Sequence, residues 1–223
     1  MTHVQANRPI TQLHIGCGPC PIRGWHNYDS NLFVHIAKLP FATHLVACLP
    51  FVPRSIIAFM ALVNKYDINF ADAAKRLPEP HDSVHTMYSS HMLEHLERDE
   101  AVAFLKEAQR VLLKGGIIRI VVPNLDYFVR TYLEDNDSHK FIEDLCLVSA
   151  KPKKLIKKLQ YVIMGHGWHH AMYNEQSLVR LVEEAGFVNI TILRPGETMI
   201  ANHDGLNLRE HEEQSIYLEA YKP

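Results

Sequence analysis

The segment that most constrains the fold is Ile117-Ile-Arg-Ile-Val-Val-Pro123, a run of mostly β-branched, apolar residues. Such a run is typical of a central parallel strand, because helices cover both faces of a parallel sheet. Six further stretches have strand character: residues 11–16, 25–29, 68–70, 85–90, 187–193 and 215–220. Helical patterns separate the middle strands, and two strands come late. We therefore predict an α/β fold, a Rossmann-like, seven-stranded, mostly parallel sheet with an antiparallel closing strand and helices on both faces.

The clearest helix is predicted over residues 99–113, where one face recurs at helical spacing. That face is formed by Val102, Leu105, Gln109 and Leu112. We expect Asp99 to cap this helix and Gly115-Gly116 to end it. Further helices are predicted over 124–134 and about 139–164, and from the cap Asn174 to Ala185 before Gly186. The alternation of polar and apolar residues over 215–220 predicts a half-exposed edge strand.

The chain of 223 residues has the length of one compact domain, and 47% of its residues are hydrophobic, which is enough for a full core. Within this single domain, 1–223, the segment 32–65 is apolar and is interrupted by Pro40, Pro50 and Pro53. We expect it to form an insertion of one or two short helices that pack over the core as a cover.

Charge and cysteine content argue against several classes of function. The net charge of −2 gives no case for a nucleic-acid partner, and four cysteines in a chain of this length do not predict a disulfide framework. The polar start lacks the apolar core of a signal peptide, and no stretch is long enough to span a bilayer, so we expect a cytoplasmic protein. The basic amphipathic stretch Lys151–Leu159 and the apolar insertion raise the alternative of peripheral membrane contact. We favour a solvated helix face and a packed cover over that alternative.

A glycine turn, Gly16-Cys17-Gly18, follows the first predicted strand. Such a turn lets the backbone approach a ligand where a side chain would clash, and ligands of these sheets bind at the carboxyl ends of the strands. The next strand ends on Asp29, only 10 residues after Gly18, and that gap contains Pro19, Pro21 and Gly24. We therefore expect the first helix of the fold to be absent or reduced to a turn.

Five groups of residues occur in the order that is typical of one enzyme family. They are Leu13-His-Ile-Gly-Cys-Gly18 with Gly24-Trp-His-Asn-Tyr-Asp29; Asp72-Ala-Ala-Lys-Arg-Leu-Pro78; Tyr88-Ser-Ser-His-Met-Leu-Glu-His-Leu96; Lys106-Glu-Ala-Gln-Arg-Val-Leu-Leu-Lys-Gly-Gly116 running into Arg119-Ile-Val-Val-Pro123; and His166-Gly-Trp-His-His-Ala-Met-Tyr-Asn174 with Leu181-Val-Glu-Glu-Ala-Gly-Phe187. In these residues the chain resembles the class I S-adenosylmethionine-dependent methyltransferases. More narrowly, it resembles a bacterial subgroup described as predicted methyltransferases of polysaccharide or lipopolysaccharide biosynthesis. The resemblance covers most of the chain except residues 32–65.

The resemblance implies S-adenosylmethionine as cofactor and assigns residues to it. Gly16, Cys17 and Gly18 would line its methionine part, and Asp29 would hydrogen-bond the ribose hydroxyls. The adenine amino group would contact Asp72 and Ala73. The strand end beneath the sulfonium would be formed by Ser90 and His91.

The late segment His166-Gly-Trp-His-His170 has two open interpretations, an acceptor-binding loop or a polar loop whose histidines are satisfied by their neighbours. An imidazole suits the role of base because its pKa lies near working pH. Our first choice for this base is His170 or His169, and the second is His95. We expect O-methylation of a small-molecule or saccharide-type acceptor.

A divalent metal is the alternative for the same residues. Some O-methyltransferases that resemble this chain at Glu94-His95 hold a metal with these two positions and a later histidine, here His166, His169 or His170. If a metal is present, its expected ligands are Glu94, His95 and His169. We favour a site without metal, in which Glu94 and His95 cap and bridge neighbouring loops.

Other interpretations of these motifs are weaker because their context is wrong. Cys17-Gly-Pro-Cys20 matches the thioredoxin redox tetrad, and His91-Met-Leu-Glu-His95 matches a zinc-peptidase pattern if it lies on a helix. Two broader alternatives also stay open, since a fold does not fix a function. One is an enzyme that uses the cofactor for another transfer or an elimination, and the other is a catalytically silent, cofactor-binding scaffold subunit.

Overall fold

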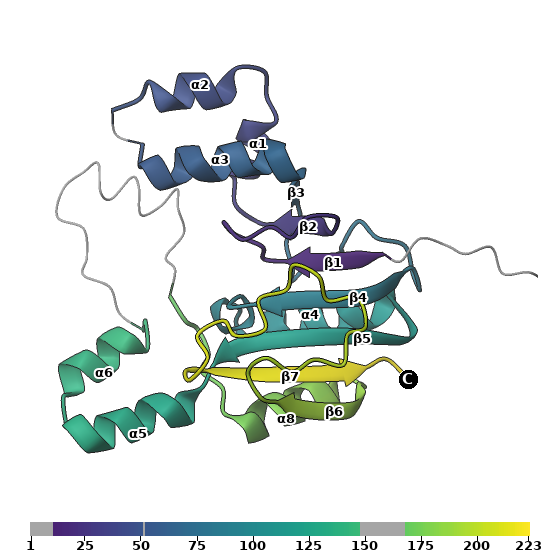
Figure 1. Ribbon diagram of the computed structural model, residues 1–223, viewed down its shortest axis with the longest axis vertical. Coiled ribbons are helices and arrows are strands. Elements are labelled where there is room, and N and C mark those ends of the chain that lie inside the picture. The colour runs from purple at the N-terminus through teal and green to yellow at the C-terminus, as the bar shows by residue number, and fades with distance from the viewer. Residues whose placement is uncertain (1–10, 51, 148–167) are drawn as a thin grey trace, which may run out of the picture.

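The computed structural model describes residues 11–50, 52–147 and 168–223, and its centre is a seven-stranded sheet of order β3-β2-β1-β4-β5-β7-β6 (Figure 1). The strands are β1 Gln12–Ile15, β2 His26–Asp29, β3 Asn69–Phe70, β4 Val84–Ser90, β5 Leu112–Pro123, β6 Val188–Leu193 and β7 Ser215–Tyr221. Strands β1 to β5 are parallel to one another, and β7 is antiparallel to both of its neighbours. The predicted fold class is confirmed.

The last strand, β7, is not the half-exposed edge strand that its alternation predicts. It lies between β5 and β6, and its five middle residues are buried. The misleading residue is Glu219, which pairs with Arg119 of β5, and neither side chain has any exposure. A buried ion pair gives a strand the same polar pattern as a solvated face, and for this reason the sequence prediction was wrong.

Helices α4 Arg98–Val111 and α8 Glu175–Glu184 pack against one face of the sheet and share its main core (Figure 1). The buried face of α4 comprises Ala101, Phe104, Leu105, Ala108 and Val111, so the predicted face is shifted. The helix is capped by Glu97, in a capping box with Glu100, and not by Asp99. It ends at Val111, because the chain is already extended at Leu112, where β5 begins before the glycine pair.

The other helices agree in part with the prediction. Asn174 caps α8 by accepting a hydrogen bond from the Ser177 amide, as expected. Helix α5 spans Leu125–Asp135, and α6 spans Ser138–Asp144. Of the helix predicted over 139–164, only residues 139–147 are described, and there α6 ends at Asp144. The remainder from residue 148 on, with Lys151–Leu159 and His166, lies outside the described residues.

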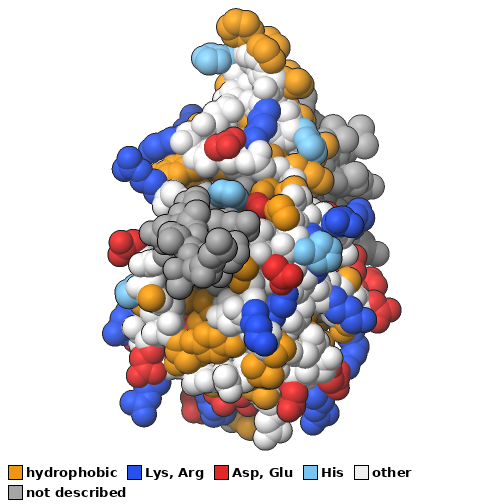
Figure 2. Space-filling model, turned by 90° about the vertical axis from the view of Figure 1, so that its right-hand side faces the viewer, with side chains coloured by type: hydrophobic (Ala, Val, Ile, Leu, Met, Phe, Trp, Pro, Cys, Tyr) orange, Lys and Arg blue, Asp and Glu red, His pale blue; other side chains and the backbone are white. Residues whose placement is uncertain are grey.

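The insertion between β2 and β3 forms three helices, one more than the upper estimate: α1 Phe33–Ala37, α2 Ala42–Ala47 and α3 Arg54–Tyr66. They share a separate apolar core that includes Cys17 and Ile68. Large apolar side chains around α2 stay exposed at the top of the molecule (Figure 2). They are Leu39, Phe41, Leu45 and Leu49. Among the described residues, no helix is long and apolar enough to cross a membrane.

No helix connects β1 to β2, as the short gap between Gly18 and Asp29 predicts; residues 16–25 form turns instead. The face of the sheet that such a helix would cover is crossed by the connection between β6 and β7, residues 194–214 (Figure 1). Under this loop lies a small core of Ile22, Trp25, Tyr88, Val121 and Tyr217, joined by Leu206. A late loop thus replaces an early helix directly beside the glycine turn.

Candidate functional site

The glycine turn lies at the carboxyl end of β1 and is tied to the end of β2. The amides of Gly16 and Cys17 both donate to the Tyr28 carbonyl, at 2.9 and 3.0 Å. Gly18 donates to the Asp29 carboxylate at 2.8 Å, and the other carboxylate oxygen accepts from the Asn31 amide. Both glycines have positive φ, +69° at Gly16 and +48° at Gly18, a conformation in which a side chain is strained.

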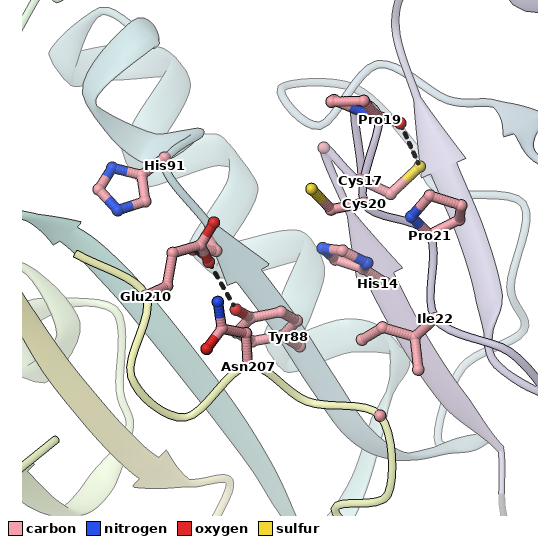
Figure 3. Close-up of a pocket in the computed structure, with 14 residues that line it drawn as sticks. His14, Cys17, Pro19, Cys20, Pro21, Ile22, Tyr88, His91, Asn207 and Glu210 are labelled. Atoms are coloured by element: carbon pink, nitrogen blue, oxygen red, sulfur yellow. Dashed lines mark hydrogen bonds between the residues drawn. The ribbon is translucent and has the colours of Figure 1, made fainter. Parts of the chain in front are cut away.

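A cavity of about 470 Å³ opens beside this turn (Figure 3). Its walls come from three parts of the chain: the turn over residues 16–22, the strands β1 and β4 with the residue that follows β4, and the loop residues Gly205, Asn207 and Glu210. The volume lies within the range of about 300–1,000 Å³ that is usual for small-molecule sites. Its position at the carboxyl ends of adjacent parallel strands is where ligands of such sheets bind.

Glu210 is the lining residue that the sequence prediction missed. Its Oε2 accepts hydrogen bonds from Ser90 Oγ at 2.5 Å and from the Tyr88 hydroxyl at 3.2 Å (Figure 3 draws the second). Its backbone carbonyl accepts a hydrogen bond from the Tyr217 hydroxyl. Burial raises the pKa of Tyr88, and the neighbouring carboxylate adds to this, so the phenol stays a donor. No local pattern marks an acid that lies 120 residues from its partner.

His14 of β1 is a buried polar residue of the cavity wall. Burial lowers its pKa to about 4, so the ring is neutral at neutral pH. The imidazole packs against the Tyr88 ring with 4.8 Å between centroids. Its Nδ1 has no hydrogen-bond partner within the described part of the chain. A buried polar atom without a partner is costly.

The predicted cofactor residues fall into two groups. Lining the cavity are Gly16, Cys17, Gly18, Ser90 and His91, while Asp29 adjoins it through its bond to Gly18. Asp72 and Ala73 follow β3, two strands away from β1, and do not line the cavity. The Asp72 side chain accepts from the Ala74 amide and pairs with Lys75, and Ala73 is part of the main core. These positions extend the row of strand ends, but outside the cavity.

A second polar cluster lies directly after β4. Glu94 has no exposure, and neither carboxylate oxygen has a hydrogen-bond partner in the described chain. His91 Nδ1 lies 3.3 Å and His169 Nε2 lies 3.9 Å from Glu94 Oε1. Ligand-type atoms of Glu94, His95 and His169 all lie within 4.8 Å of one another. The structure thus brings together the three residues named as candidate metal ligands.

The candidate bases differ in their surroundings. His169 is largely covered, and burial lowers its pKa, an effect that the Glu94 charge partly offsets. His95 Nδ1 lies 2.9 Å from the Trp168 carbonyl, and its ring meets the His169 ring edge-on. His170 is exposed, and its backbone amide donates to the Glu94 carbonyl at 2.7 Å. Of the three, His95 and His169 face the buried carboxylate.

The competing motif interpretations do not fit this geometry. Both thiols of Cys17-Gly-Pro-Cys20 are free, and burial raises the pKa of Cys17, whereas a reactive thiol needs a lowered pKa. Residues 91–95 do not lie on an α-helix; His91 follows the strand, and Leu93–His95 form a 3₁₀ turn. His91 and His95 therefore do not share a helical face, as the peptidase pattern requires.

Comparison with known proteins finds a partial family match and similar folds. Residues 37–120 match a family model described as a methyltransferase domain, a segment that runs from the insertion through β4 to β5. A structure of an S-adenosylmethionine-dependent methyltransferase from Thermotoga maritima, described as a possible histamine N-methyltransferase, is 14% identical. It has a TM-score of 0.52, with 97% of this chain and 83% of that chain covered. Another from Archaeoglobus fulgidus is 15% identical, with a TM-score of 0.52 and coverage of 96% and 86%. No curated protein matches the sequence.

The structural likeness shows the fold, and the match to the methyltransferase domain covers residues 37–120, less than half of the chain. The two together support an S-adenosylmethionine-dependent methyltransferase. The matched segment includes Ser90, His91 and Glu94 but begins after the glycine turn and Asp29.

Proposed function

We propose that this chain transfers a methyl group from S-adenosylmethionine to a hydroxyl group of a small-molecule or saccharide-type acceptor. The observation that carries the proposal is the adjacency of the cavity and the buried acid–imidazole cluster. His91 belongs to both, since it lines the cavity and lies 3.3 Å from Glu94. A methyl donor held in the cavity therefore has candidate proton acceptors next to it.

The residues present fit the cofactor. The cavity has sufficient volume, and the Gly18 position is open, because a Cβ there would meet no atom within 4 Å. We assign Gly16, Cys17 and Gly18 to the methionine part, and Ser90 and His91 to the region beneath the sulfonium. The Asp29 carboxylate uses two of its roughly four acceptor positions on backbone amides, which leaves capacity for ribose hydroxyls. Asp72 and Ala73 are assigned to the adenine end, beyond the cavity.

The cofactor supplies a positively charged sulfonium with a good leaving group. The protein contributes the geometry of approach, which can be worth up to about 7–11 kcal/mol. An imidazole takes the proton of the acceptor hydroxyl as the oxygen gains the methyl group, and such a base adds about 10²–10⁴-fold. His169 suits this role, because its lowered pKa keeps it neutral at working pH. The alternatives are His170, which is exposed on the same loop, and His95 of the turn after β4, whose ring contacts that of His169.

A divalent metal is a second candidate for the cluster, favoured by one observation. Glu94 is fully buried and accepts no hydrogen bond in the described chain, and burial of a carboxylate is costly unless it is paired or coordinates a metal. Glu94, His95 and His169 would hold the ion, which would lower the pKa of the acceptor hydroxyl. Elemental analysis of the purified protein tests this: bound metal that is lost in Glu94→Ala supports it, and metal-free protein with full, chelator-resistant activity rules it out.

The activity is tested by incubating the purified chain with S-adenosylmethionine and a panel of hydroxylated acceptors, including sugars and saccharides. We expect S-adenosylhomocysteine to form only when an acceptor is present, and formation to fall in His169→Ala. Cofactor binding without turnover on every acceptor would favour the silent scaffold subunit. A cofactor-derived product other than S-adenosylhomocysteine would favour another transfer or an elimination.

A further inference from the structure

The charge of the cavity wall is uneven. Among the described lining residues there is one carboxylate, Glu210, and no lysine or arginine. Of the wall histidines, His14 is kept neutral by burial and does not offset this charge. The cavity is therefore suited to a ligand that carries a positive charge.

Glu210 is held in place before any ligand arrives. Ser90 Oγ and the Tyr88 hydroxyl both donate to Oε2, and the Tyr217 hydroxyl fixes the Glu210 backbone carbonyl. Oε1 makes no hydrogen bond to any residue that the structure describes, so one oxygen of a positioned carboxylate stays available. A carboxylate that accepts from a charged donor forms a stronger hydrogen bond than a pair of neutral groups does.

The position of Glu210 indicates which part of the ligand its carboxylate contacts. The carboxylate stands across the cavity from the turn Gly16–Gly18, and both line the same space (Figure 3). This turn is the part of the site assigned to the methionine end of the cofactor, and that end carries an ammonium group. We propose that Glu210 binds this ammonium group, an inference that rests on the proposed function. The loop between β6 and β7 thereby supplies a contact on the face where the first helix is missing.

Calorimetry with three ligands tests the assignment on the intact chain. S-adenosylmethionine and S-adenosylhomocysteine both contain the ammonium group, whereas 5′-methylthioadenosine has neither the ammonium group nor the sulfonium. We expect Glu210→Gln to weaken binding of the first two about 10- to 100-fold, as for loss of a charged hydrogen bond, and to leave the third unchanged. The matched control is Glu212→Gln on the same loop, an exposed carboxylate paired with Arg209, which should change none of the three.

Three results would overturn the assignment. Equal weakening of all three ligands would mean that Glu210 acts only by holding Tyr88 and Ser90. Weakening of S-adenosylmethionine alone would place the carboxylate at the sulfonium, and no change at all would remove it from binding. If Glu210→Gln does not fold, Glu210→Asp takes its place: it keeps the charge but shortens the reach, and it should weaken the two ammonium ligands and spare 5′-methylthioadenosine. Wild-type protein that binds neither S-adenosylmethionine nor S-adenosylhomocysteine refutes the proposed function itself.

Discussion

Substituting the two glycines of the turn by alanine should have unequal effects on stability. At Gly16 an added Cβ would lie 2.5 Å from Met92 Cγ and 2.8 Å from Met92 Cβ. At Gly18 it would meet nothing within 4 Å. Both positions have positive φ, so each alanine costs about 1–2 kcal/mol of backbone strain. Only Gly16→Ala adds a steric clash, because the Met92 Cβ cannot swing away without moving its backbone.

Overpacking of this kind typically costs about 1–3 kcal/mol, so we expect Gly16→Ala to lose about 2–5 kcal/mol of unfolding free energy. Gly18→Ala should lose only about 1–2 kcal/mol. For a denaturant slope of about 2 kcal/mol per molar, the urea midpoint should fall by about 1–2.5 M and 0.5–1 M respectively.

The assay is equilibrium urea unfolding, followed by far-UV circular dichroism, of wild-type protein and both variants without cofactor. A loss in Gly16→Ala no greater than in Gly18→Ala would refute the reasoning, since the clash with Met92 is the only difference invoked. Calorimetry on the same samples adds a second readout. Gly18→Ala should fold and yet bind S-adenosylmethionine more weakly, because its methyl group enters the cavity.

Three further predictions concern the buried charges and the turn. Glu219→Ala should lose about 3–5 kcal/mol of unfolding free energy by leaving Arg119 buried without its partner, and denaturant unfolding measures this. Because the pKa of His14 is about 4 in the folded chain and near 6.5 unfolded, the unfolded state binds more protons between these values, so stability falls as pH drops from 6.5 to 4. His14→Phe should reduce that fall by about 3 kcal/mol, as seen in unfolding midpoints across pH; an unchanged slope would contradict the burial effect. Asp29→Ala should weaken cofactor binding by calorimetry, because it removes both the proposed ribose contact and the acceptor of the Gly18 amide; unchanged affinity would sink the assignment.

Much of the fold could be predicted because its signals are local. The apolar run of β5, the Asn174 cap and the short gap before Asp29 each act over a few residues, and each indicated the right structure. The sequence predictions failed where the structure of a segment depends on a residue far away in the sequence. The position of β7 depends on the burial of Glu219 against Arg119, and a strand read alone cannot show that its acid is paired.

The candidate site divides in the same way. Residues at the ends of β1 and β4 were assigned to one site by the family resemblance, and they lie together because parallel strands bring their carboxyl ends to one edge of the sheet. Glu94, His95 and His169 were also named in advance, and they lie close together. Glu210 was not, because it belongs to a loop without periodic pattern whose path is set by tertiary contacts with Ser90 and Tyr217.

Because Glu210 forms part of the cavity wall, the cavity cannot be complete until this late residue has been synthesised. Ser90 and Glu210 are separated by 120 residues, which ribosomes take roughly 6–24 s to add. Strand β7 lies between β5 and β6, so the sheet closes only after the final strand has emerged. Until then the nascent chain carries the glycine turn and β4 with an open face and an unpaired Tyr88 hydroxyl. Under the proposed function, cofactor binding belongs to the last step of folding, and a bound cofactor would stabilise the closed sheet.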